Sequence, residues 1–291
     1  MDAKKTELSR QIESISEGVS NVVRELRKSR AGASTVSHSI FQIFPTTKNR
    51  RFEYSHCEAV SQWVFDNLLR ECEAGEHEAA CRLYYNLARL PWADSLRGCL
   101  FERQVLYYLD SIKTNHDLPM RGLTNPHDEA LWTYRGPINR STFEERTVAN
   151  SIKKAVADRT PVHLVPLIPN FPTVDSIVYH PDDNVLTCIQ ITIKDVRPIA
   201  TSGLRRIQKW LIPQTPSACL RPRPENPWRF IFIVRSDTAS NFTLQAFEGE
   251  TPDAWAQKVD QFVLGLDEET LFGDRSKWNI SPSSSVEQVQ C

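Results

Sequence analysis

Polar side chains alternate with isoleucines in the segment TCIQITIKD, at residues 187–195. Gln190, Thr192 and Lys194 share one face of the predicted strand, because successive side chains of a strand point to opposite faces. A carboxyl group, Asp175, stands just before the preceding apolar run, SIVYH. The intervening HPDDN has the composition of a turn, so we expect a hairpin that lays Asp175 beside the polar row.

These residue types suit metal-dependent hydrolysis of a phosphodiester, which needs oxygen ligands for a hard cation and a positive charge near the phosphate. Asp175 would supply a carboxylate, and the Gln190 side chain and the Ile191 carbonyl would supply neutral oxygens. Lys194 would supply the positive charge, and Glu102, in the helical segment GCLFERQVLYYL, a second carboxylate. The candidate catalytic residues are therefore Asp175, Gln190, Lys194 and Glu102, of which Asp175, Glu102 and Gln190 are candidate metal ligands.

The same residues are also expected in an ordinary sheet and helix that form no catalytic or metal-binding site. Asp175 would then cap a turn, Glu102 would be a solvated helix residue, and the row from Gln190 to Lys194 would be a wet sheet face. Polar alternation is common in strands, and spacing alone favours this simpler interpretation. Both interpretations stay open from the sequence.

A basic helix is predicted directly after this hairpin, in the segment SGLRRIQKWLI. Arg205, Arg206 and Lys209 are candidates for binding the phosphate backbone of DNA. The alternative is that they form a solvated helix face, which is the commoner role of a run of charges.

The composition and charge of the chain restrict the kinds of protein it can be. The 291 residues carry a formal charge of −1 with a pI near 6.7, so a nucleic-acid site must be a local basic patch. The seven cysteines are odd in number and form no CxxC pair, which indicates reduced thiols and gives little support for a zinc site. A P-loop, a GxGxxG fingerprint, an apolar leader and a membrane-length apolar run are all missing. We expect a soluble intracellular protein, in the nucleus or cytoplasm, with no membrane partner.

The chain should divide into four regions with an α/β fold. We expect an amphipathic helix and linker at 1–37, a helical module at 38–95, a nuclease-like domain at 96–275 and a flexible tail at 276–291. The helical module should hold a short strand at 39–45 and helices at 55–72 and 76–90. In the domain we expect helices at 97–112, 202–212 and 253–266, and strands at 161–168, 174–180, 185–193 and 228–236.

The motif order resembles one known family. GCLFE at 98–102, then NFPTVDSIV, CIQITIKDVRPI and SGLRRIQKWL resemble the C-terminal part of Crinkler-type and retrotransposon-hot-spot-type proteins of fungi and oomycetes. That part is a restriction-endonuclease-like domain of the PD-(D/E)xK superfamily, and the resemblance covers roughly residues 38–250. It implies an α/β (α+β) core with a helix, a mixed sheet of about four strands and a second helix.

The resemblance also implies a function. Glu102 would match the acid of the first helix, Asp175 the central aspartate and Gln190 the acid or glutamine of the third strand, in a DNA endonuclease that uses Mg²⁺ or Mn²⁺. Thr192 stands where an active member has its lysine, and Lys194 lies two residues further on. The alternative is therefore an inactive nuclease-fold module that binds a protein or nucleic acid. Such proteins commonly carry an upstream ATPase module, so we expect this chain to be a fragment or a reduced member.

Overall fold

The computed structural model describes residues 41–48, 51–59, 81, 84–85, 88, 94–124, 129–135, 138, 140–167 and 171–274. The helix and linker expected at 1–37 and the tail expected at 276–291 lie outside these residues. The chain divides into two compact units, one comprising Met1–Phe101 with Glu269–Cys291 and the other Glu102–Glu268.

The first unit contains an antiparallel hairpin of β1 (Phe41–Lys48) and β2 (Arg51–Ala59). The helix expected at 55–72 is therefore wrong at its start, because residues 55–59 belong to β2. The sequence RFEYSHC alternates large apolar and polar residues with the period of a strand, and this pattern outweighs the serine cap. The remainder of that expected helix lies outside the described residues.

The second unit is built on a mixed sheet of eight strands within the described residues. In spatial order these are β4 (Glu129–Arg135), β3 (Asn115–Gly122), β12 (Val259–Leu266), β10 (Trp228–Arg235), β8 (Val185–Ile191), β7 (Ser176–His180), β6 (Val162–Pro166) and β5 (Arg140–Phe143). β6, β7 and β8 form an antiparallel meander, and β10 lies parallel to both β8 and β12. The sheet is thus mixed, as expected, but larger than four strands.

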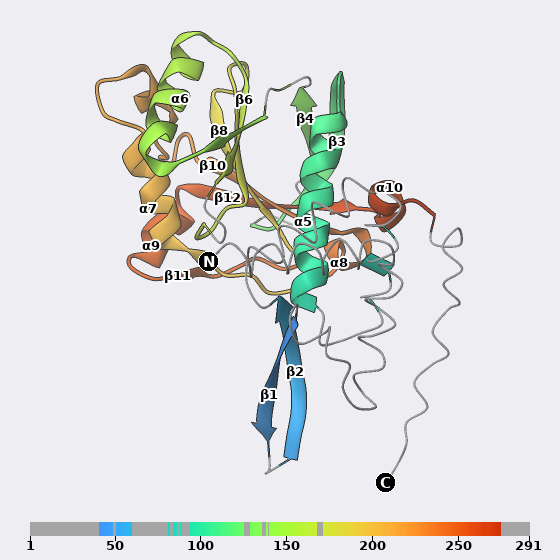
Figure 1. Ribbon diagram of the computed structural model, residues 1–291. Coiled ribbons are helices and arrows are strands. Elements are labelled where there is room, and N and C mark those ends of the chain that lie inside the picture. The colour runs from blue at the N-terminus through green and yellow to red at the C-terminus, as the bar shows by residue number, and fades with distance from the viewer. Residues whose placement is uncertain are drawn as a thin grey trace, which may run out of the picture. The chain divides into compact units, whose positions relative to one another are not determined.

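The principal helices are α5 (Asp94–Ser111), α6 (Glu145–Ala157) and α7 (Thr201–Trp210). The shorter elements of the unit are β9 (Ile199–Ala200), a 3-10 helix (Pro216–Leu220), α8 (Ser236–Ala239), β11 (Phe247–Glu248) and α9 (Pro252–Ala256). A further helix, α10 (Glu268–Phe272), begins in this unit and continues into the first. In Figure 1, α6 and α7 lie on one side of the sheet, and the part of α5 that belongs to this unit lies on the other.

The helix expected at 253–266 is wrong in its second half, which forms β12. The valines at 259 and 263 fit a helical spacing as well as an alternating one, so the sequence alone is ambiguous. Pairing decides the outcome, because all eight residues of β12 lie in parallel register with β10, from Trp228 opposite Val259 to Arg235 opposite Leu266. Tertiary contact here overrides local propensity.

Both faces of the central strand β8 are buried. Leu186 and Cys188 belong to the apolar cluster that includes Ile152 of α6 and Ile207 of α7. Ile189 and Ile191, which point to the opposite face, are also buried. A strand inside a sheet that is covered on both sides has no wet face. The simple interpretation of the polar row as a solvated surface is therefore wrong for Gln190, which is only 2% exposed.

α7 packs against the loop that leads into β7, and Gly203 is the point of contact. A Cβ built on Gly203 would overlap the Pro172 carbonyl oxygen and the Thr173 hydroxyl. Thr173 in turn donates its hydroxyl proton to the carbonyl oxygen of Ala200, just before α7 begins. Since Asp175 follows two residues later, this contact fixes the backbone that carries it.

The close approach predicts an unusual response to Gly203→Ala. Alanine normally stabilises a helix interior by about 1 kcal/mol relative to glycine. Here we expect a loss of about 1–3 kcal/mol in the free energy of unfolding, the typical cost of overpacking. Urea denaturation measures this loss. The control is Ser202→Ala, at an exposed neighbouring position, whose free energy of unfolding should stay within about 0.5 kcal/mol of wild type. Stabilisation by Gly203→Ala would contradict the packing described.

Candidate functional site

Asp175 closes the hairpin at the carboxyl end of β8. Its backbone N–H donates to the carbonyl oxygen of Ile189 at 2.9 Å, and its side-chain Oδ2 accepts the backbone N–H of Ile191 at 2.6 Å. Asp175 itself precedes β7, whose first residue, Ser176, lies opposite Ile189 of β8. The hairpin thus brings Asp175 to the end of β8, with one carboxylate oxygen held by the backbone of Ile191.

Gln190 presents a buried oxygen at this position. Its Oε1 atom is buried and has no hydrogen-bond partner within the described residues. By strand alternation Gln190 shares the face of β8 that carries Leu186 and Cys188, which pack towards α6 and α7. A buried acceptor with no partner costs free energy, on the order of 1–3 kcal/mol. Such a group calls for a ligand or a water molecule.

Glu102, on α5, interacts electrostatically with Asp175, although the two residues are far apart in the sequence. Burial, and then the negative charge of Asp175, raise the pKa of Glu102 from 4.5 to about 8. Burial raises the pKa of Asp175 from 3.8 to about 6, against the opposing effects of the Ile191 N–H and of Arg197. The structure thus brings together the two carboxyl groups that the sequence singled out.

The end of the polar row departs from expectation, because β8 stops at Ile191 and the chain leaves the sheet. Thr192 is buried and accepts the backbone N–H of Lys194 on its hydroxyl at 3.0 Å, which turns the chain. Lys194 is exposed, and its ammonium group makes no ion pair with any described residue. Thr192 and Lys194 therefore do not continue the strand face that carries Gln190.

Arg197 is the site residue that the sequence analysis missed. Its positive charge lowers the pKa of both Glu102 and Asp175, in opposition to their burial. The side chain is exposed, and within the described part of the chain its guanidinium makes no ion pair. Arg197 lies in the loop between β8 and β9, where neither a strand nor a helix period applies, so only the path of the loop could reveal it.

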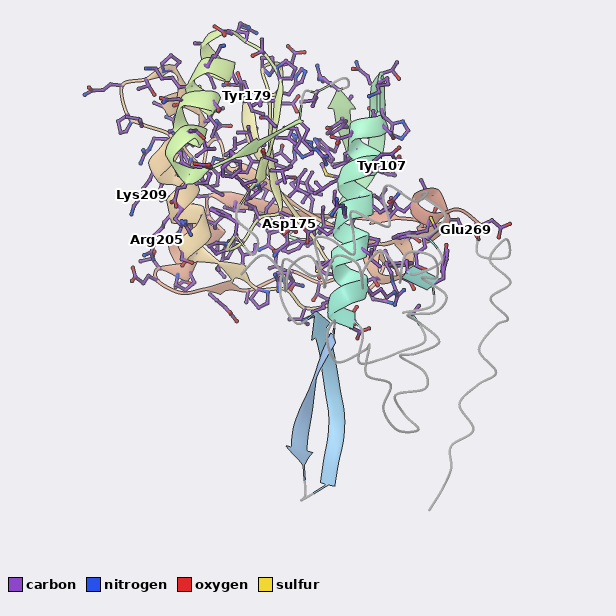
Figure 2. The ribbon with its side chains drawn as sticks, in the orientation of Figure 1. Tyr107, Asp175, Tyr179, Arg205, Lys209 and Glu269 are labelled. Carbon is purple, nitrogen blue, oxygen red and sulfur yellow. The ribbon has the colours of Figure 1, made fainter. Side chains whose placement is uncertain are left out.

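Two residues of the basic helix are already paired. Arg205 forms an ion pair with Glu250 and also donates to its backbone carbonyl, and Arg206 forms an ion pair with Glu145. In Figure 2, Arg205 and Lys209 project from α7 on the side away from Asp175. The basic helix is thus partly neutralised and faces away from the carboxyl groups.

The residues at the carboxyl end of β8 fit a hard cation. In the described ranges no group of three or more His, Cys, Asp or Glu side chains is placed to hold a metal ion, which speaks against a zinc-type cage. Mg²⁺ instead takes oxygen ligands, often only one or two carboxylates, and keeps several waters. Glu102 and the second oxygen of Asp175 would offer two such carboxylates to a cation.

The raised pKa of Glu102 predicts the pH dependence of stability. Between about pH 4.5, its value in an unfolded chain, and about pH 8, the folded protein retains a proton that the unfolded chain has released. The contribution of Glu102 to the free energy of unfolding is therefore fully present below pH 4.5 and is lost as the pH rises through 8.

Glu102→Gln should remove this loss, because glutamine resembles the protonated acid. We expect the variant to match wild type near pH 4.5 and to exceed it above pH 8, by at least about 1 kcal/mol, the equivalent of less than a single pKa unit. Urea denaturation at a series of pH values, with chelator present, measures the difference. A difference independent of pH would show that Glu102 is not buried beside Asp175.

None of the helices described is long and apolar enough to cross a membrane. Comparisons of the chain with family models, with curated proteins and with solved structures found no match. The function must therefore be inferred from the chemistry of the site itself.

Proposed function

We propose that this protein is a metal-dependent nuclease that hydrolyses phosphodiester bonds in DNA. The observation that carries the proposal is the meeting of Glu102 and Asp175, which are 73 positions apart in sequence. Two desolvated carboxyl groups destabilise each other, so their pairing suits a site that binds a cation.

The order of elements supports a restriction-endonuclease-like core. Helix α6 is followed by the meander β6, β7 and β8, then by α7 and β10, an order compatible with the helix, mixed sheet and second helix that the resemblance implies. The helix that leads into the meander is α6, however, and Glu102 comes from α5. The first acid of the proposed site would thus reach it from an added helix.

Glu102, Asp175 and Gln190 would hold the cation, and Mg²⁺ or Mn²⁺ bound there would polarise the phosphate and lower the pKa of a bound water. Asp175 is oriented by the Ile191 N–H, which leaves its other oxygen for the site. Burial keeps the carboxyl groups poorly solvated, so their electrostatic interactions are stronger than in water. The exposed loop after β8 leaves a route for a polymeric substrate from solvent.

A second candidate is an inactive nuclease-fold module that binds DNA or a protein partner. Thr192 favours this second candidate, because it stands in place of the expected lysine. Its hydroxyl accepts a hydrogen bond from the backbone N–H of Lys194. The two candidates differ in whether phosphodiester hydrolysis occurs at all.

Cleavage of plasmid DNA tests the proposal through Asp175→Asn. Asparagine keeps an acceptor for the Ile191 N–H, so the fold should survive while a carboxylate is lost. We expect Mg²⁺-dependent cleavage to fall by at least about 100-fold, the effect typical of removing one preorganised charged group. Asp182→Asn, at the turn of the same hairpin, is the matched control and should cut normally. Wild-type rates in Asp175→Asn would remove this residue from the site.

Metal binding gives a readout that does not depend on activity. Mg²⁺ or Mn²⁺ should raise the melting temperature of wild type, since a ligand at 100 times its dissociation constant stabilises the folded state by about 2.7 kcal/mol. Asp175→Asn and Glu102→Gln should lose most of this increase, and Asp182→Asn should keep it. Equal increases in all four proteins would place the metal elsewhere.

A further inference from the structure

The loop that follows β8 is fixed at both ends. Thr192 donates its backbone N–H to the Ile233 carbonyl of β10 at 3.0 Å, and its hydroxyl holds the Lys194 N–H. At the far end, Ile199 donates its N–H to the Ala246 carbonyl at 2.9 Å. The segment from Thr192 to Ile199 is therefore a short span with defined ends.

Between these ends, one buried glutamine holds the backbone of the loop. The Gln245 side chain accepts the Arg197 N–H on Oε1 at 2.6 Å and donates from Nε2 to the Asp195 carbonyl at 3.4 Å. Gln245 is itself held by Gln261 of β12, whose amide bonds both its N–H and its carbonyl at 2.9 Å. Both glutamines are buried, so these hydrogen bonds are shielded from water.

In this arrangement Arg197 has a fixed backbone and a solvent-exposed side chain. Its backbone is held within the loop, its side chain reaches solvent, and its charge acts on Glu102 and Asp175. Arg205 and Arg206, in contrast, are engaged by carboxylates of the chain. A planar guanidinium suits the oxygens of a phosphate group, to which it can donate two hydrogen bonds.

We propose that Arg197 contacts a phosphate of the bound DNA, taking the role that the sequence assigns to Lys194, and that Gln245 is the positioning residue that holds it there. The inference rests on the proposed function for its substrate class, a DNA phosphate beside the carboxyl groups. It requires DNA binding but not cleavage.

DNA binding in the presence of EDTA tests Arg197 independently of catalysis. The probe is a short fluorescein-labelled DNA duplex, and its anisotropy is measured over a range of salt concentrations. Arg197→Met should weaken binding by about tenfold, in keeping with a lost charged hydrogen bond, and should reduce the slope of log affinity against log salt by about 0.9, the value for one phosphate contact. Lys194→Met, an exposed cation on the same loop, is the matched control and should change both quantities much less.

Gln245→Met tests the positioning role through a double-mutant cycle. If Gln245 acts through Arg197, then Arg197→Met should lose most of its effect on binding in the Gln245→Met background. A purely structural role would leave the two effects additive. Gln245→Asn, which keeps an amide but shortens its reach, serves as the second variant and should give the same coupling with a smaller loss of stability.

The outcomes separate this inference from the nuclease proposal. Weaker DNA binding by Arg197→Met in a protein that does not cleave would support the inference and refute the nuclease. Cleavage that depends on Asp175, with unchanged DNA binding by Arg197→Met, would overturn the inference alone. Equal losses from Arg197→Met and Lys194→Met would also overturn it, since any charge on the loop would then suffice. A wild-type protein that binds no DNA would overturn both.

Discussion

The hydrogen bond from the Ile191 N–H to the Asp175 carboxylate is the contact on which the site depends. It joins the start of β7 to the end of β8, so the carboxylate completes the strand pairing where the backbone ladder stops. The same bond holds one oxygen of Asp175 at the end of β8. The packing of Gly203 against Pro172 supports it from behind, because this contact fixes the loop that leads into Asp175. Without these two contacts the carboxyl group would have no defined position.

Burial on both faces of the central sheet explains why the site is electrostatically strained. An eight-stranded sheet with helices on both sides leaves little solvent near the end of β8. Glu102, Asp175 and Gln190 are polar groups in this environment, and the described chain satisfies them only in part. Several other charged residues of the unit are paired, as Arg206 is with Glu145. The raised pKa values of Glu102 and Asp175 distinguish the end of β8 from these paired positions.

Local sequence patterns predicted the central part of the fold and less of the site. The apolar runs at 161–168, 174–180, 185–193 and 228–236 become β6, β7, β8 and β10, because short runs bounded by turn residues have few alternatives to a strand. β12 was mistaken for a helix, since its valines fit either period until β10 pairs with them. Glu102 and Asp175 were linked by the chemistry of their side chains and by the family resemblance, whereas Arg197 depends on a loop path that Gln245, 48 positions away, determines. Long-range contacts of this kind leave no local pattern.

The central claim is that Glu102, Asp175 and Gln190 hold one divalent cation. Anomalous scattering from crystals grown with Mn²⁺ tests it most directly, because the metal position is then observed without reference to activity. The account predicts a single strong peak at the carboxyl end of β8, at roughly 2.0–2.3 Å from oxygens of Glu102 and Asp175, the range of hard-cation coordination. The Gln190 Oε1 atom should face the same ion, directly or through a water. A saturated crystal with no peak there, or with the ion bound by other residues, would contradict the account.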